Sequence, residues 1–180
     1  MTDTIQSADA DRESESIDPA MLRERSDVTY EESTTVHDVD HYESHSHDTA
    51  VVGVTNDDGA VCCFVNAERA FAGLPWEQVS DGDWLDAAHA AIENWCTGTG
   101  MAITVDGVAL VRRVDHELAD DEPRATTHTI LFHATPVKSD PDLENLTGAA
   151  DWDAGWYDDV PAVATETPDE IVADIRRFVG

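Results

Sequence analysis

The sequence has 180 residues, enough for one domain with a hydrophobic core and a tail. Its 39 acidic against 10 basic residues give a formal net charge of -29, which argues against binding to nucleic acid phosphates or anionic membranes. No apolar run approaches the roughly 20 residues of a membrane span, and the N-terminus lacks a secretion-signal pattern. We therefore expect a cytoplasmic protein.

The acidic residues are spread along the whole chain, and Lys138 is the only lysine. A negative charge that is spread so evenly destabilises a compact state at low salt through self-repulsion. At molar salt the Debye length shrinks to ~3 Å, and the repulsion is screened. This pattern indicates a protein of a salt-accumulating halophile, which we interpret as a haloarchaeon. The alternative is an ordinary acidic protein with a disordered tail.

Residues 1–48 are predicted to form an acidic, largely disordered tail, because residues 1–19 are polar and show no apolar period. Within it, residues 20–25 favour a short helical turn, and residues 28–30 favour an edge strand or an adherent arm. Residues 37–48 hold half of the eight histidines of the protein. Imidazole and carboxylate groups there suggest metal binding, but a flexible histidine-bearing linker is the interpretation we adopt.

The folded domain is predicted at residues 49–180. Residues 50–55 and 60–66 are typical of buried strands, and residues 56–59 (Asn-Asp-Asp-Gly) predict a hairpin turn between them. We therefore expect these two strands to pair with each other. Residues 67–73 are predicted to be a loop that contains a turn of helix.

Residues 74–101 predict a loop, an amphipathic helix and a glycine-rich end. Ser80, Asp81 and Asp83 offer acceptors to the free N–H groups at the start of the helix. An apolar stripe recurs at i, i+4, i+7 and i+11, formed by Trp84, Ala88, Ala91 and Trp95. The other side of the helix carries Asp86, His89 and Glu93. Gly98 and Gly100 end the helix, since glycine adopts the left-handed conformation of a C-cap.

The second half of the chain reads mainly as strands. Residues 101–105 predict a strand, residues 106–107 (Asp-Gly) a tight turn, and residues 108–118 a strand with Arg112 on the same face as Leu110. Residues 126–135 return antiparallel to it, with Ile130, Phe132 and Ala134 facing inward. Residues 154–157 predict a short strand.

A final helix is predicted up to about residue 179, with Thr167 as its N-cap and Pro168 at its first position. The three cysteines, Cys62, Cys63 and Cys96, lack spaced partners, so we expect core thiols in a reducing compartment.

The loop, helix and glycine layout of residues 74–101 resembles the Nudix box of the Nudix hydrolase superfamily. In that box a Leu-Pro-Gly-Gly loop leads into a helix whose Arg-Glu-x-x-Glu-Glu face holds magnesium, followed by Thr-Gly and an apolar residue. Leu74 and Pro75 match the loop, and residues 99–101 (Thr-Gly-Met) match the end. The order of the predicted elements over about 130 residues, including residues 156–161 (Trp-Tyr to Pro) near the end, is also similar to a Nudix domain.

The resemblance is in the layout and the ends of the box, since its glutamates are replaced. With residues 99–101 as the closing segment, Thr97 and Gly98 stand at the paired glutamates, and residues 93–94 (Glu-Asn) stand at Arg-Glu. With the box ending at residues 97–98 instead, Trp95 and Cys96 stand at the pair. Both alignments lack the diagnostic carboxylates.

The resemblance implies an α/β fold, an α/β/α sandwich with a mixed, largely antiparallel sheet. It also implies Mg or Mn as cofactor and hydrolysis of nucleoside diphosphate-linked substrates, and such domains often form homodimers. On the helix, Asp86 and Glu93 are the candidate metal ligands, with Glu93 as the candidate catalytic residue; a solvated acidic face is the alternative. Arg112 is a candidate for phosphate contact or for an ion pair, and Trp76 for ring stacking or a lid.

Two functions therefore remain open. One is a Nudix hydrolase whose catalytic glutamates have been lost or replaced by other acids. The other is a non-catalytic Nudix-fold module that binds a nucleotide-type small molecule or a protein partner.

Overall fold

The computed structural model describes residues 17–37, 47–118, 125–138, 143 and 151–179. The elements are a short 3-10 helix η1 (Met21–Glu24), the strands β1 (Thr29–His37), β2 (Thr49–Val54), β3 (Val61–Asn66), β4 (Phe71–Gly73), β5 (Trp76–Gln78), β6 (Ile103–Leu118), β7 (Ala125–Pro136) and β8 (Asp153–Tyr157), and the helices α2 (Trp84–Trp95) and α3 (Asp169–Arg176). The strands form a five-stranded sheet of order β1-β6-β7-β2-β5 and a three-stranded sheet of order β4-β3-β8.

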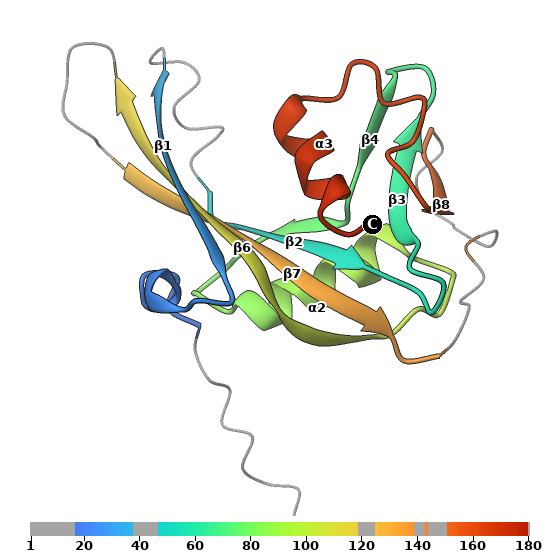
Figure 1. The fold of residues 1–180 in the computed structure, drawn as a ribbon, viewed down its shortest axis with the longest axis horizontal. Helices are drawn as coiled ribbons and strands as arrows, with labels where there is room; N and C mark the ends of the chain where they lie inside the picture. The colour runs from blue at the N-terminus through green and yellow to red at the C-terminus, as the bar shows by residue number, and fades with distance from the viewer. Residues whose placement is uncertain (1–16, 38–46, 119–124, 139–142, 144–150, 180) are drawn as a thin grey trace, which may run out of the picture.

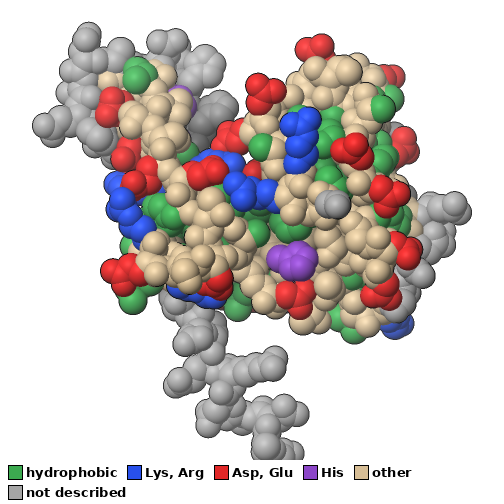
Figure 2. Space-filling model, in the orientation of Figure 1, with side chains coloured by type: hydrophobic (Ala, Val, Ile, Leu, Met, Phe, Trp, Pro, Cys, Tyr) green, Lys and Arg blue, Asp and Glu red, His purple; other side chains and the backbone are tan. Residues whose placement is uncertain are grey.

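The large sheet lies between the two helices, with α2 on one face and α3, beside the small sheet, on the other (Figure 1). It is mixed, because β1 with β6 and β2 with β7 are parallel pairs, whereas β6 with β7 and β2 with β5 are antiparallel. This confirms the predicted α/β sandwich with a mixed sheet. Acidic side chains lie scattered over the face shown in Figure 2, with few basic ones among them.

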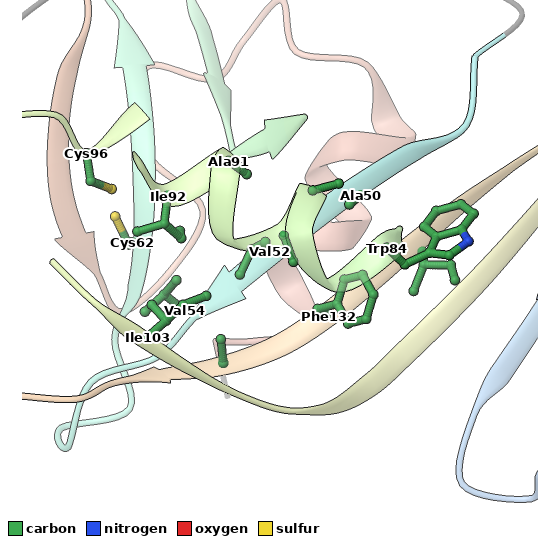
Figure 3. Close-up of a cluster of buried hydrophobic side chains, with 14 of the residues drawn as sticks. Ala50, Val52, Val54, Cys62, Trp84, Ala91, Ile92, Cys96, Ile103 and Phe132 are labelled. Atoms are coloured by element: carbon green, nitrogen blue, oxygen red, sulfur yellow. The ribbon is translucent and has the colours of Figure 1, made fainter. Parts of the chain in front are cut away.

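The core has two parts because the central strands are buried on both faces. Ile130, Phe132 and Ala134 of β7 pack in the cluster that contains α2, which confirms their predicted inward orientation. Figure 3 shows Phe132 in this cluster. Leu131, between Ile130 and Phe132, packs instead in the second cluster with Ile175 of α3. Successive residues of β7 therefore point to opposite faces of the sheet and pack in different clusters.

The predicted pairing of residues 50–55 with 60–66 is wrong. β2 lies in the large sheet beside β7 and β5, whereas β3 lies in the small sheet between β4 and β8, and only Thr55 and Val61 form a bridge between them. The turn itself is present, because the Asn56 side-chain oxygen accepts hydrogen bonds from the backbone N–H groups of Asp58 and Ala60. The predicted loop at 67–73 ends in β4.

The tight turn predicted at residues 106–107 is also wrong. β6 runs through this point as one strand of 16 residues, with register shifts between Val105 and Gly107 and between Val108 and Leu110. The carboxylate of Asp106 accepts a hydrogen bond from the Thr135 hydroxyl on β7 (3.1 Å). The Asp-Gly pair thus forms a β-bulge, which inserts a residue without reversing the chain. The hairpin of β6 with β7 is present as predicted.

β1 extends the predicted edge strand at residues 28–30 to nine residues, all paired in parallel with β6. It lies N-terminal to residue 49, so part of the segment predicted as tail belongs to the sheet. Residues 1–16 and 38–46, which hold the rest of that tail and most of the histidine-rich segment, lie outside the described residues. In the described part of the chain, no helix is long and apolar enough to cross a membrane.

Helix α2 agrees closely with its prediction. The Asp83 carboxylate accepts a hydrogen bond from the backbone N–H of Asp86 (3.1 Å), as an N-cap does. Trp84, Ala88 and Ala91 are buried, and the positive φ angles at Gly98 (86°) and Gly100 (67°) follow the helix end.

The predicted start and end of the last helix are wrong. Pro168 takes the N-cap position of α3, and the hydroxyl of Thr167 instead accepts a hydrogen bond from the backbone N–H of Ala72 in β4 (2.9 Å). Both residues are buried, so the N–H at the edge strand is satisfied by the segment that leads into α3. The helix ends at Arg176, three residues earlier than predicted.

Candidate ligand-binding site

A cavity of about 470 Å³ lies where the small sheet meets α3, β5 and the end of α2. It is lined by Val51, Phe64, Arg69, Phe71, Gly73, Leu74, Trp76, Trp95, Trp152, Ile171 and Asp174. Five of these side chains are aromatic, and only Arg69 and Asp174 carry charge. The cavity is therefore an apolar, aromatic site with two charged groups on its wall.

Trp95, the last residue of α2, is the centre of the aromatic wall. Its ring centroid lies 4.9 Å from that of Phe64, 5.7 Å from that of Trp152 and 6.3 Å from that of Trp76. The Trp152 ring also meets Phe71 edge to face, at 5.9 Å. The indole N–H of Trp95 donates to the backbone oxygen of Trp76 (2.9 Å), which satisfies the polar edge of the ring.

Asp174 lies on α3 and is only 6% exposed. Its carboxylate accepts hydrogen bonds from both terminal nitrogens of the Arg112 guanidinium, the shorter at 3.0 Å. Glu170 on α3 and Glu31 on β1 also pair with Arg112. Burial by itself lowers the pKa of Arg112, but the hydrogen bond that Arg112 donates to Asp174 and the three carboxylate charges outweigh it and raise the pKa. The Asp174 carboxylate is thus held by Arg112 from behind the cavity wall.

The residues predicted from the sequence separate into two groups. Trp76 lines the cavity and is 45% exposed, and Arg112 reaches the cavity wall through Asp174. Asp86 and Glu93 lie on the exposed side of α2 and are not part of the cavity lining. Arg112, proposed for phosphate contact or ion pairing, forms ion pairs with residues of β1 and α3 and not with its neighbours on β6.

Sequence reasoning missed Arg69, Phe71, Trp152 and Asp174. They come from the turn after β3, from β4, from the residue before β8 and from α3, so no local spacing connects them. Trp152 carried the only signal, as an isolated aromatic residue in a polar segment.

Among the described residues, no three His, Cys, Asp or Glu side chains form a group that could hold a metal ion. Asp86 and Glu93 are seven residues apart on α2, a rise of about 10 Å. One Mg²⁺ or Mn²⁺ ion needs oxygen ligands at about 2.1 Å, so these two carboxylates by themselves do not bind the same ion, and each would need further ligands from elsewhere in the chain. Their role as metal ligands stays a prediction.

Cys62 of β3 and Cys96 at the end of α2 face each other in the core (Figure 3). The hydrogen bond between the two side chains, together with burial, raises the pKa of Cys62 well above its usual value. Burial raises the pKa of Cys63 to about 12. All three cysteines are free and buried, as predicted for core thiols, and such thiols are poor nucleophiles.

The architecture defines the protein as one of Nudix fold. A NUDIX hydrolase from Nitrosomonas europaea is similar over 74% of this chain and 88% of its own, with a TM-score of 0.51 and 15% identity. A MutT NUDIX hydrolase from Burkholderia pseudomallei is similar over 74% of this chain and 98% of its own (TM-score 0.44, 19% identity). The dihydroneopterin triphosphate pyrophosphohydrolase of E. coli is similar over 73% and 93% (TM-score 0.45, 14% identity). No family model and no curated protein matches the sequence.

Proposed function

We propose that this chain is a binding module of Nudix fold that holds a nucleotide-type small molecule by its planar ring. The observation that carries the proposal is the cavity walled by Trp76, Trp95 and Trp152. Its volume of about 470 Å³ lies within the range of about 300–1,000 Å³ that is usual for small-molecule sites. Aromatic walls with few polar groups favour a planar ring, and stacking on one aromatic side chain contributes about 1–3 kcal/mol per base.

The position of Trp95 supports binding over catalysis. In one of the two alignments with the Nudix box, Trp95 stands at a diagnostic glutamate, and its ring forms the centre of the cavity wall. A glutamate there would present a carboxylate for a metal, whereas an indole presents a stacking surface. In that alignment, a position that carries a metal-binding glutamate in the Nudix box therefore offers, in this chain, a surface on which a ligand ring can stack.

The test is calorimetric titration of adenosine and guanosine into the protein in concentrated KCl. Trp76→Ala removes an exposed part of the wall and leaves intact the backbone oxygen that Trp95 contacts. We expect saturable binding at a 1:1 ratio that weakens about tenfold in this variant, the equivalent of one lost stacking contact. Val137→Ala, which removes another exposed hydrophobic side chain and lies outside the lining, is the matched control and is expected to bind as the unchanged protein does. The proposal is contradicted if neither nucleoside binds, or if Trp76→Ala binds them as tightly as the unchanged protein does.

The second candidate is hydrolysis of nucleoside diphosphate-linked substrates with Mg²⁺ or Mn²⁺, for which the Nudix fold is the support. Asp86 as ligand and Glu93 as ligand and catalytic residue are its candidates. Phosphate release from a panel of nucleotide diphosphates, in the presence and absence of the metals, tests it. Metal-dependent turnover that Glu93→Gln abolishes would establish the hydrolase and overturn the non-catalytic function.

We further propose that the protein works in the cytoplasm of a halophilic archaeon, without nucleic acid or membrane as partner, and as a monomer or a homodimer. The net charge of -29 supports the halophilic origin and the absence of nucleic acid and membrane partners. Light scattering in concentrated KCl distinguishes the monomer from the dimer.

A further inference from the structure

Arg69 differs from most of the other described arginines in its surroundings. Arg23, Arg25, Arg112, Arg113 and Arg177 each form an ion pair with a carboxylate. Within the described part of the chain, Arg69 and Arg176 form none. In a protein with 39 acidic residues, a guanidinium that lines a cavity and pairs with none of the described carboxylates is available to an anion from outside.

The turn that carries Arg69 is fixed to the rest of the small sheet. The backbone N–H of Arg69 donates to the side-chain oxygen of Asn66 (3.0 Å), and Asn66 is only 2% exposed. The next residue, Ala70, has a φ of 51°, and its carbonyl accepts a hydrogen bond from the backbone N–H of Glu166. Arg69 therefore starts from a constrained backbone position and lines the cavity from there.

The second charged group of the wall already has a partner. The carboxylate of Asp174 is buried and paired with Arg112, so among the described lining residues Arg69 is the charged one without an ion pair. The rest of the lining is apolar or aromatic, and such walls favour a ring over a chain of charged groups. The wall thus combines ring-stacking surface with one cation.

We infer that the cavity selects a planar aromatic ligand that carries one anionic group, a carboxylate or a phosphate, and that Arg69 pairs with this group. The inference rests on the proposed binding function and adds to it the residue that sets specificity. The guanidinium forms two parallel hydrogen bonds with either anion, which an ammonium does not. Asp174 keeps lone pairs that accept a hydrogen bond from a ring N–H.

The experiment uses two pairs of probes that differ in the anionic group alone or nearly so. Indole-3-acetate is compared with the neutral alcohol tryptophol, and AMP is compared with adenosine, by calorimetry in concentrated KCl and in the lowest KCl concentration at which circular dichroism shows the protein folded. We expect the anionic member of at least one pair to bind about tenfold more tightly at the lower salt concentration, as for one charge-assisted hydrogen bond. The preference is expected to decrease in concentrated KCl, where charges are screened. The pair that shows the larger preference identifies carboxylate or phosphate as the source of the anion.

The variants are Arg69→Gln and, as matched control, Arg176→Gln, which removes the other described arginine without an ion pair and lies outside the lining. Arg69→Gln is expected to abolish the preference for the anion and to leave the affinity for the neutral ring unchanged. Arg176→Gln is expected to keep the preference. Equal affinities within both pairs, or a preference that survives Arg69→Gln, overturns the inference and leaves the ring-binding function standing. If neither the neutral nor the anionic probes bind, the ring-binding function and the inference about Arg69 are both wrong.

Discussion

Arg112 shows how a buried cation stabilises this acidic protein. The side chains of Arg112 and Asp174 are only 11% and 8% exposed, and the pair connects β6 to α3 behind the cavity wall. Breaking a buried pair is costly because the remaining charge stays desolvated and uncompensated.

We predict that Arg112→Met lowers the free energy of unfolding by about 3–5 kcal/mol. The control is Arg113→Met, which removes an arginine that is 35% exposed and pairs with Glu32 and Asp115. Its loss is expected to stay below about 1 kcal/mol. Urea unfolding of both variants in concentrated KCl measures the difference, and equal losses would contradict the assigned role of Arg112.

Gly53 of β2 leaves space for the ring of Phe178. A Cβ at Gly53 would lie 2.3 Å from the ring, which also stacks on His133 with a centroid separation of 5.8 Å. We predict that Gly53→Ala destabilises the protein by about 1–3 kcal/mol, because Phe178 has to leave the sheet. Gly107→Ala is the matched control, since a Cβ there meets nothing within 4 Å. Thermal unfolding compares the two variants. If Gly53→Ala unfolds at the same temperature as the unchanged protein, the packing of Phe178 contributes little to stability.

Among the elements, β4 is connected to the segment that leads into α3. The Thr167 hydroxyl accepts the backbone N–H of Ala72 in β4, and both residues are buried. We predict that Thr167→Val lowers the free energy of unfolding by about 1–3 kcal/mol, because the N–H loses its acceptor. Thr167→Ser keeps the oxygen and is expected to recover most of the loss. Hydrogen exchange at Ala72 is expected to accelerate in the valine variant alone, and an unchanged rate would refute the contact.

The elements predicted correctly are those specified by neighbouring residues. The start of α2 follows from Asp83 and its end from Gly98 and Gly100, all within a short segment. The partner of β3 could not be predicted in the same way. Strands that are apolar on both faces indicate burial, but the choice between β2 and β8 as a neighbour depends on packing across the whole chain.

The candidate site was predicted in part for the same reason. Trp76 was identified because an aromatic residue in the loop before α2 suits ring stacking, whatever the rest of the fold. Arg69 and Trp152 are far apart in the chain, and the pairing of β3 with β4 and β8 brings them to one cavity. The packing of α3, through the pair of Asp174 with Arg112, adds Asp174.

At the scale of the whole molecule, charge dominates. The net charge of -29 is spread over the chain, and the compact state brings these charges closer together than the unfolded state does. We predict that the midpoint of thermal unfolding rises steeply from dilute to molar KCl as the Debye length falls from about 10 Å to about 3 Å. Sucrose at equal osmolality is the control, because it strengthens burial without screening. A midpoint that rises equally in both solutes would argue against repulsion as the cause.

The contacts of Trp95 also have an optical consequence. Its indole lies 5.7 Å from that of Trp152 and nearly perpendicular to it (89°), and 6.3 Å from that of Trp76 at 48°. Indole transition dipoles at such separations couple, so that absorbed light excites the rings jointly and circular dichroism shows paired bands of opposite sign. The amplitude depends on the mutual orientation of the rings. The cavity wall is therefore itself a chromophore, whose spectrum changes when a guest ring turns any one of the three indoles.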